Sequence, residues 1–262
     1  MNGNERHGMV IQERDRHLLR ELSLIRVIDR EQAKIIAEFG STTRVNVRLL
    51  ALTRAGLLRR FFLGTTAAGR KALYSLSAKG VSLVGAPPRN FQRKKDETLA
   101  TDLFVQHQLA VNQVYCSFKY RALPPGVTFI RWLGFHQPLT QGLRLIPDGY
   151  LELGTPSSTI ASFLELDRGT ESLKVWKDKT RNYLQLALSG EFERRFHQTR
   201  FRVLVLATSD RRLLSIRAAV ASLTEKIFWF STLPLAHGAG FFQPLWLRPK
   251  GAQPVPLIEQ PK

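Results

Sequence analysis

The sequence has almost no cysteine, no long apolar run and, over one long stretch, no acidic residue. Its single cysteine, Cys116, excludes an internal disulfide framework and a zinc site built from several cysteines. No run of about 18 apolar residues occurs, so we expect no membrane-spanning helix and no membrane partner. The first twelve residues lack the apolar core of a secretory signal, and the expected compartment is therefore the cytoplasm.

Apolar residues make up 44% of the 262 residues, which is enough for a buried core and argues against a disordered chain. Lysine and arginine number 39 against 21 acidic residues, so the formal net charge is +18. The stretch 39–95 alone contains twelve basic residues and no aspartate or glutamate. A folded segment with only positive charge predicts a polyanionic partner, because each phosphate contact releases counterions. We therefore expect the chain to bind nucleic acid.

The N-terminal part of the chain has the pattern helix, helix, turn, helix, basic hairpin. Apolar residues at helical spacing predict three helices, over 15–23, 29–39 and 41–55. Asp29 is a capping residue for the second helix, and Ser41 or Thr42 for the third. Two apolar runs around a turn of glycine, threonine and alanine predict a hairpin over 57–76, which a short helix over 77–84 follows. This order is that of a winged helix-turn-helix.

In a winged helix, the third helix enters a major groove and the hairpin lies on the flanking backbone. The candidates for groove contact are side chains of the third helix, namely Thr43, Arg44, Asn46, Val47 and Arg48. The candidates for phosphate contact are basic residues of the hairpin, namely Arg59, Arg60, Arg70 and Lys71. The alternative is a winged helix that serves protein contacts.

Adjacent prolines followed by clustered basic residues predict an extended linker over 85–98. We therefore expect a winged helix-turn-helix domain over 1–84, a second domain over 99–248, and a flexible tail over 249–262. The second domain alternates long helical patterns with short β-like runs, in the order α-β-β-β-α-β plus a further α-β. The predicted fold class is α+β.

Three acidic residues of the second domain occupy related positions. Asp148 lies on the second predicted strand, and Glu165 and Asp167 end the third strand, where residues two apart share a face. If these strands pair, the carboxylates converge into a hard-oxygen site suited to Mg²⁺ or Mn²⁺. Such an ion would activate water and stabilise charge on a scissile phosphate. The alternative is that Asp148 belongs to an ordinary turn and Asp167 caps a helix.

The motifs Pro147-Asp148 and Glu165-Leu166-Asp167 resemble those of the PD-(D/E)XK nuclease superfamily, whose restriction-endonuclease-like fold has the order αβββαβ. The resemblance implies a divalent-metal-dependent DNA endonuclease, with Asp148, Glu165 and Asp167 as catalytic residues and metal ligands. The superfamily has a lysine where this chain has Asp167. The candidates to replace that lysine lie on the next helix, with Lys179 ahead of Lys174 and Lys177. Otherwise the fold keeps only a DNA-binding shape.

Several short motifs follow one another along the chain: Arg14-Asp15, 52–58, 74–80, His107 with Val111-Asn112, 146–149, 164–171, and Lys179 with Tyr183. In this order they resemble the replication-relaxation family of plasmid and mobile-element proteins. That resemblance implies a DNA-binding role in plasmid replication or transfer, with DNA and other replication or transfer proteins as partners; a homodimer is compatible with it. Two functions stay open: a Mg²⁺-dependent endonuclease that nicks or cuts DNA, and a non-catalytic regulator or relaxosome-type accessory factor.

Overall fold

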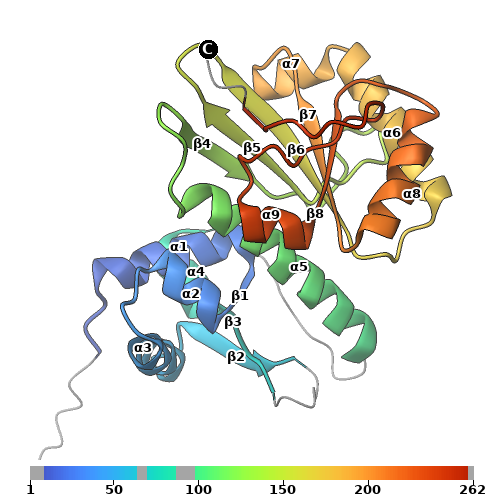
Figure 1. The fold of residues 1–262 in the computed structure, drawn as a ribbon. Coiled ribbons are helices and arrows are strands. Elements are labelled where there is room, and N and C mark those ends of the chain that lie inside the picture. The colour runs from blue at the N-terminus through green and yellow to red at the C-terminus, as the bar shows by residue number, and fades with distance from the viewer. Residues whose placement is uncertain (1–8, 64–69, 87–97, 259–262) are drawn as a thin grey trace, which may run out of the picture. The chain divides into compact units, whose positions relative to one another are not determined.

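The structure is a computed structural model that describes residues 9–63, 70–86 and 98–258 (Figure 1). The chain divides into two compact units, Met1–Cys116 and Ser117–Lys262. Each unit combines helices with one sheet, so the fold class is mixed α+β, as predicted. Within the described segments, every helix is too short or too polar to cross a membrane.

In the first unit, helices precede a β-hairpin and a further helix follows it. The elements in chain order are α1 (Glu13–Ile25), β1 (Val27–Asp29), α2 (Arg30–Ile36), α3 (Thr42–Arg54), β2 (Leu58–Phe62), β3 (Ala72–Leu76) and α4 (Ala78–Val84). The three strands form an antiparallel sheet in the order β1-β3-β2. The sequence pattern predicts every element of this unit except β1, because three residues are too few to show an alternation. The predicted hairpin turn falls on residues 64–69, outside the described residues.

Side-chain caps fix where α2 and α3 begin. The carboxylate of Asp29 accepts a hydrogen bond from the backbone N–H of Gln32 at 2.8 Å, which confirms the predicted start of α2. The hydroxyl of Ser41 accepts one from the backbone N–H of Arg44 at 3.3 Å, which selects Ser41 over Thr42 as the cap of α3. Both caps satisfy backbone N–H groups that the first turn of a helix leaves unpaired, so the first residues of α2 and α3 follow from the local sequence.

The long helix α5 (Thr98–Lys119) packs against the first unit. The side-chain amide of Asn112 donates to the backbone carbonyls of Ile25 at 3.0 Å and of Val27 at 2.6 Å. The side-chain amide of Gln32 donates to the carbonyl of Leu109 at 2.8 Å. These buried bonds satisfy carbonyls at the end of α1 and in β1, so α5 completes the first unit.

The division between the two units falls inside α5, which differs from the predicted linker over 85–98 and the second domain expected to begin at 99. The amphipathic pattern of α5 shows that one face is covered, but it does not show by which unit. Residues 87–97 of the predicted linker lie outside the described residues.

The second unit is built on a five-stranded mixed sheet with helices between its strands (Figure 1). Its elements after α5 are β4 (Thr128–Leu133), β5 (Gly149–Gly154), β6 (Thr159–Asp167), α6 (Leu173–Leu188), α7 (Glu191–Phe196), β7 (Arg202–Ala207), α8 (Asp210–Ala221), β8 (Phe228–Thr232) and α9 (Leu233–Ala239). The strand order is β4-β5-β6-β7-β8, with antiparallel pairing from β4 to β6 and parallel pairing from β6 to β8. The sequence pattern does not predict the short helices α7 and α9.

An aromatic core fills the space between one face of this sheet and helices α6, α7 and α8. The ring of Phe163 in β6 lies 5.1 Å from those of Tyr150 and Phe201 and 5.5 Å from those of Tyr183 and Phe196. All five side chains are buried. This packing holds β5, β6 and α6 in fixed relation. Asp148 immediately precedes β5, Glu165 and Asp167 lie on β6, and Lys179 lies on α6.

The C-terminal segment up to residue 258 is packed against the second unit, which differs from the flexible tail predicted over 249–262. Trp246 and Val255 exchange backbone hydrogen bonds of 3.1 and 2.9 Å, and Leu257 is completely buried. The guanidinium of Arg217 donates to the carbonyl of Arg248 at 2.7 Å. A segment with few apolar residues is thus held by one buried leucine and by backbone pairing, and neither produces a periodic signal in the sequence. Residues 259–262 lie outside the described residues.

Candidate functional site

Strand β6 presents Glu165 and Asp167 on one face, as residues two apart on a strand do, and both side chains reach helix α6. The carboxylate of Glu165 accepts hydrogen bonds from Lys179 Nζ at 2.8 Å and from the Tyr183 hydroxyl at 2.6 Å. The carboxylate of Asp167 accepts one from the Trp176 indole N–H at 2.9 Å. Both acids are buried, so their charges are compensated inside the protein rather than by water.

Asp148 is fixed beside the same strand. It immediately precedes β5, its carboxylate accepts from the backbone N–H of Leu166 at 2.7 Å, and its own N–H donates to Leu164 at 3.1 Å. The next residue is Gly149, where a side chain does not fit, because a Cβ at that position would lie 2.4 Å from the ring of Trp132. The two hydrogen bonds to Leu164 and Leu166 therefore place the Asp148 carboxylate next to the part of β6 that carries Glu165.

Asp167 is the most completely satisfied of the three acids. Arg212 Nε and Nη2 from α8 each lie 2.7 Å from one of its oxygens, and the backbone N–H of Gly169 donates to it at 2.7 Å. Burial raises the pKa of Asp167, but the hydrogen bonds from Arg212 and Trp176 outweigh burial and hold the pKa below its ordinary value. The Asp167 carboxylate therefore stays ionised as half of a bidentate ion pair.

Glu165 has the opposite balance. Burial raises its pKa to about 7; the nearby charge of Lys179 opposes this shift, and that of Asp148 adds to it. Lys179 Nζ lies 2.8 Å from both Glu165 and Glu171. Burial lowers the pKa of Lys179, but the two glutamates outweigh burial and raise it. Of the three candidate lysines, Lys179 is the one that reaches Glu165, while Lys174 is exposed.

The predicted metal ligands Asp148, Glu165 and Asp167 do not fit a divalent ion as a set of three. Both oxygens of Glu165 and both oxygens of Asp167 already accept hydrogen bonds, and Lys179 and Arg212 supply the positive charge that an ion would bring. Among the residues that the structure places, no group of three or more His, Cys, Asp or Glu side chains is arranged to hold a metal ion. The cluster is instead a network of buried ion pairs.

In the first unit, helix α3 separates a buried face from an exposed one. Its apolar stripe of Val45, Leu49 and Leu52 is fully buried. The exposed side chains on the first half of the helix are four of the predicted groove residues, namely Thr43, Arg44, Asn46 and Val47. The N-terminal half of α3 thus offers these side chains to a partner outside the chain.

Arg48 is placed differently from the other predicted groove residues. Its Nε donates to the buried carboxylate of Asp15 at 2.7 Å, and its Nη2 donates to the same carboxylate and to the carbonyl of Val10 at 2.7 Å. These bonds raise the pKa of Arg48, chiefly through the hydrogen bond to Asp15. Arg48 therefore links α3 to α1 and compensates a buried acid.

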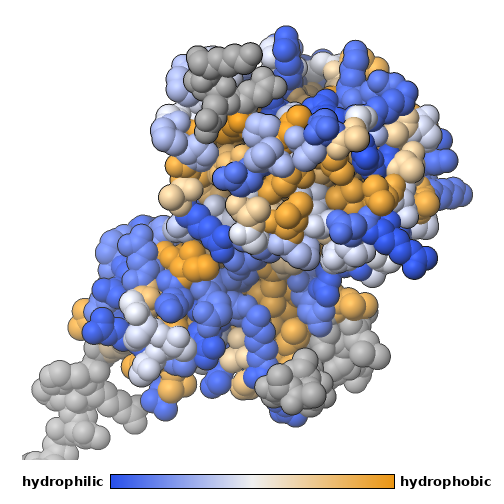
Figure 2. Space-filling view, viewed as in Figure 1, coloured by the Kyte–Doolittle hydropathy of each residue, from blue (hydrophilic) through white to orange (hydrophobic). Residues whose placement is uncertain are grey.

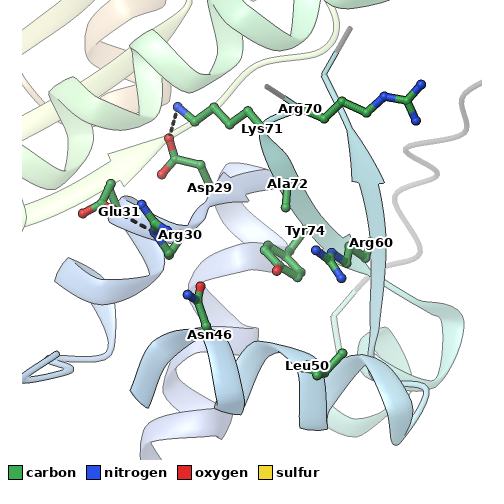
Figure 3. Close-up of a pocket in the computed structure, with 10 residues that line it drawn as sticks. All are labelled: Asp29, Arg30, Glu31, Asn46, Leu50, Arg60, Arg70, Lys71, Ala72 and Tyr74. Carbon is green, nitrogen blue, oxygen red and sulfur yellow. Dashed lines mark hydrogen bonds and ion pairs between the residues drawn. The ribbon is translucent and has the colours of Figure 1, made fainter. Parts of the chain in front are cut away.

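A cavity of about 720 Å³ opens between α3, the start of α2 and the hairpin (Figure 3). Asn46 and Leu50 of α3 face Arg60 and Tyr74 of the hairpin across it. Two ion pairs lie among the residues that line the cavity. Lys71 Nζ is 2.5 Å from the Asp29 carboxylate, and Arg30 Nε is 2.9 Å from the Glu31 carboxylate. Among the predicted phosphate-contact residues, Arg59, Arg60 and Arg70 are exposed, and Lys71 is half-exposed beside Asp29.

A family model described as replication-relaxation matches residues 19–199, about two thirds of the chain. The chain belongs to the replication-relaxation family. Comparisons with curated proteins and with solved structures gave no match. Membership of this family suggests a role in the replication or relaxation of plasmids or mobile elements.

The family match covers α3, the hairpin and the cluster residues of β6 and α6, but it ends before Arg212. The ion pair of this replication-relaxation protein at Asp167 is therefore completed by a residue outside the matched range. The sequence reading missed Arg212 as the partner of Asp167. The parallel pairing of β6 with β7, which places Asp167 beside Ala207, brings the start of the helix after β7 to the same edge of the sheet, and this pairing belongs to the tertiary structure.

Proposed function

We propose that this replication-relaxation protein binds duplex DNA through α3 and the β2–β3 hairpin. The order of α1, α2 and α3 before the hairpin, together with the strand order β1-β3-β2, supports a winged helix-turn-helix. In such a unit α3 enters the major groove and the hairpin follows the adjacent backbone.

One observation carries this proposal. Elements α3, β2 and β3 contain no acidic residue, and their basic residues are exposed except for Arg48. The exposed cations of α3 and the hairpin are Arg44, Arg54, Arg59, Arg60, Arg70 and Lys71, of which Lys71 is paired with Asp29. Because the five arginines lie at the surface rather than against buried acids, they remain available to phosphate groups.

The salt dependence of DNA affinity tests the proposal. The double substitution Arg44→Ala with Arg60→Ala removes two phosphate contacts, so we expect the slope of log affinity against log salt concentration to fall by about 1.8. Fluorescence anisotropy with a labelled duplex of random sequence measures this slope. Arg20→Ala removes one exposed charge from α1, outside the proposed contact surface, and should leave the slope unchanged. An unchanged slope in the double variant would mean that α3 and the hairpin are not the contact surface.

We further propose that the second unit acts without cleaving DNA, as an accessory module in binding or assembly. The pairing of Glu165 with Lys179 and of Asp167 with Arg212 supports this, because both buried carboxylates already have a cation of the same unit as partner. Cleavage is the second candidate, and one observation favours it: Asp148, Glu165 and Lys179 stand together on a β-β-β-α-β unit like that of the nuclease superfamily.

Incubation of supercoiled plasmid with the full-length protein and Mg²⁺ or Mn²⁺ separates these candidates. The accessory role predicts that the plasmid stays supercoiled at protein concentrations that saturate it. Nicked or linear product that disappears with Asp148→Ala would establish cleavage by this unit. Product that persists in Asp148→Ala at the same rate indicates a contaminating nuclease, and repurification must then remove it.

A further inference from the structure

Val47 stands out on the solvent face of α3. Its side chain is 63% exposed, whereas Val45 two residues earlier and Leu49 two residues later are fully buried. An exposed valine is a poorer helix former than alanine, because its branched side chain loses rotamer freedom in a helix. Neither burial nor helix propensity therefore accounts for a valine at this position.

The side chains one turn before and one turn after Val47 on the exposed face carry no charge, and the exposed Arg54 lies two turns after it. Thr43 lies one turn before Val47 and Ala51 one turn after it on the same side. Arg44 lies on one flank of these three side chains, and Asn46 on the other flank faces the cavity. On the face that Figure 2 shows, hydrophilic residues prevail over the first unit, with hydrophobic patches among them. An isolated apolar side chain between polar groups is suited to one small apolar target.

We propose that Val47 contacts the C5-methyl group of a pyrimidine, in thymine or in 5-methylcytosine, in the major groove. This inference rests on the proposed DNA binding and names a feature of the site that α3 reads. The thymine methyl is the apolar group on base edges in the major groove, where the other recognition groups are hydrogen-bond donors and acceptors. Val47 thus makes α3 selective for a methylated pyrimidine at one position, while Arg44 positions the helix on the backbone.

Replacing thymine by deoxyuridine tests the inference, because it removes the methyl group and leaves the base-pairing edge unchanged. The full-length protein first selects duplexes from a random pool. Each selected duplex is then synthesised as a series in which one thymine at a time is replaced by deoxyuridine. We expect one position at which this change weakens binding about fourfold, the value for one buried methyl group. In Val47→Ala the same change should have no effect on affinity, whereas Val47→Ile should retain the difference.

Leu83→Ala is the matched control, because Leu83 is another exposed apolar residue of the first unit outside α3. The ratio of its affinity for the thymine duplex to its affinity for the deoxyuridine duplex should equal the ratio measured for the unchanged protein. A second pool, in which cytosine is replaced by 5-methylcytosine, distinguishes the two possible sources of the methyl group. If duplexes from this pool bind more tightly than the thymine duplex, and Val47→Ala removes that advantage, Val47 contacts 5-methylcytosine.

Two results would overturn the inference while leaving DNA binding in place. One is salt-dependent binding with no enriched sequence or with no deoxyuridine effect at any position. The other is a deoxyuridine effect that is equally large in Val47→Ala. Loss of all duplex binding in the unchanged protein would instead contradict the proposed function itself.

Discussion

The basic surface of the first unit and the acidic cluster of the second unit use charge in opposite ways. On α3 and the hairpin, cations such as Arg44 and Arg59 are exposed. In the second unit, Glu165 and Asp167 are buried and each is bonded to a cation of the same unit. Exposed charge is free to meet a partner, whereas buried paired charge stabilises the fold and is costly to disturb. The comparison teaches that an uneven count of charges predicts function only where the charges stay at the surface.

The largest expected effect comes from removing the cation of the buried pair. Arg212→Ala leaves the Asp167 carboxylate buried without its partner, so we expect the free energy of unfolding to fall by about 4 kcal/mol. Urea denaturation measures this loss. Arg211→Ala removes the neighbouring exposed arginine and should change stability by less than about 0.5 kcal/mol. Equal effects of the two substitutions would show that burial does not distinguish these charges.

The raised pKa of Glu165 makes the second unit sensitive to pH. The folded state holds a proton on Glu165 up to about pH 7, whereas the unfolded chain releases it near its ordinary value of 4.5. Stability should therefore fall as pH rises through this window, by about 3 kcal/mol. Glu165→Gln removes the titrating group, so its unfolding free energy should lack this fall. Parallel pH profiles for the two proteins in urea denaturation would contradict the assignment.

The last comparison concerns two arginines one turn apart on α3. Arg48→Ala should lower the free energy of unfolding by about 3 kcal/mol, because it leaves the buried Asp15 carboxylate without its main donor. Arg44→Ala should leave stability unchanged and weaken DNA binding, since the Arg44 side chain is exposed. Urea denaturation and anisotropy on both variants measure the contrast. If Arg44→Ala destabilised the fold and left DNA affinity normal, the assignment of Arg44 as a DNA contact would be wrong.

Local sequence rules predict the elements of this fold more fully than their contacts. The caps Asp29 and Ser41, the hairpin strands and the span of β6 follow from side chains a few residues apart. The assignment of α5 to the first unit depends on Asn112 meeting carbonyls more than eighty residues away in sequence, which no local pattern reports. The same holds for Leu257, whose burial orders a segment that its composition predicts to be loose.

For the acidic cluster, sequence spacing indicates that Glu165 and Asp167 share a face and that Lys179 is the lysine to examine. It does not indicate that Arg212 neutralises Asp167 or that both oxygens of Glu165 are engaged. For the basic surface, the sequence indicates which residues lie on α3, but it treats Arg48 as equivalent to Arg44. Only the position of Asp15 on the neighbouring helix separates the two arginines.

The sequence by itself therefore determined the mixed α+β class, the basic character of the first unit and the spacing of the acids, because these depend on composition and on short periodicities. The tertiary structure decided which charges face solvent and which are paired in the interior. The physical reason is that the energy of a charge depends on burial and on the nearest opposite charge. Both are set by residues such as Arg212 and Asp15, which lie far away along the chain.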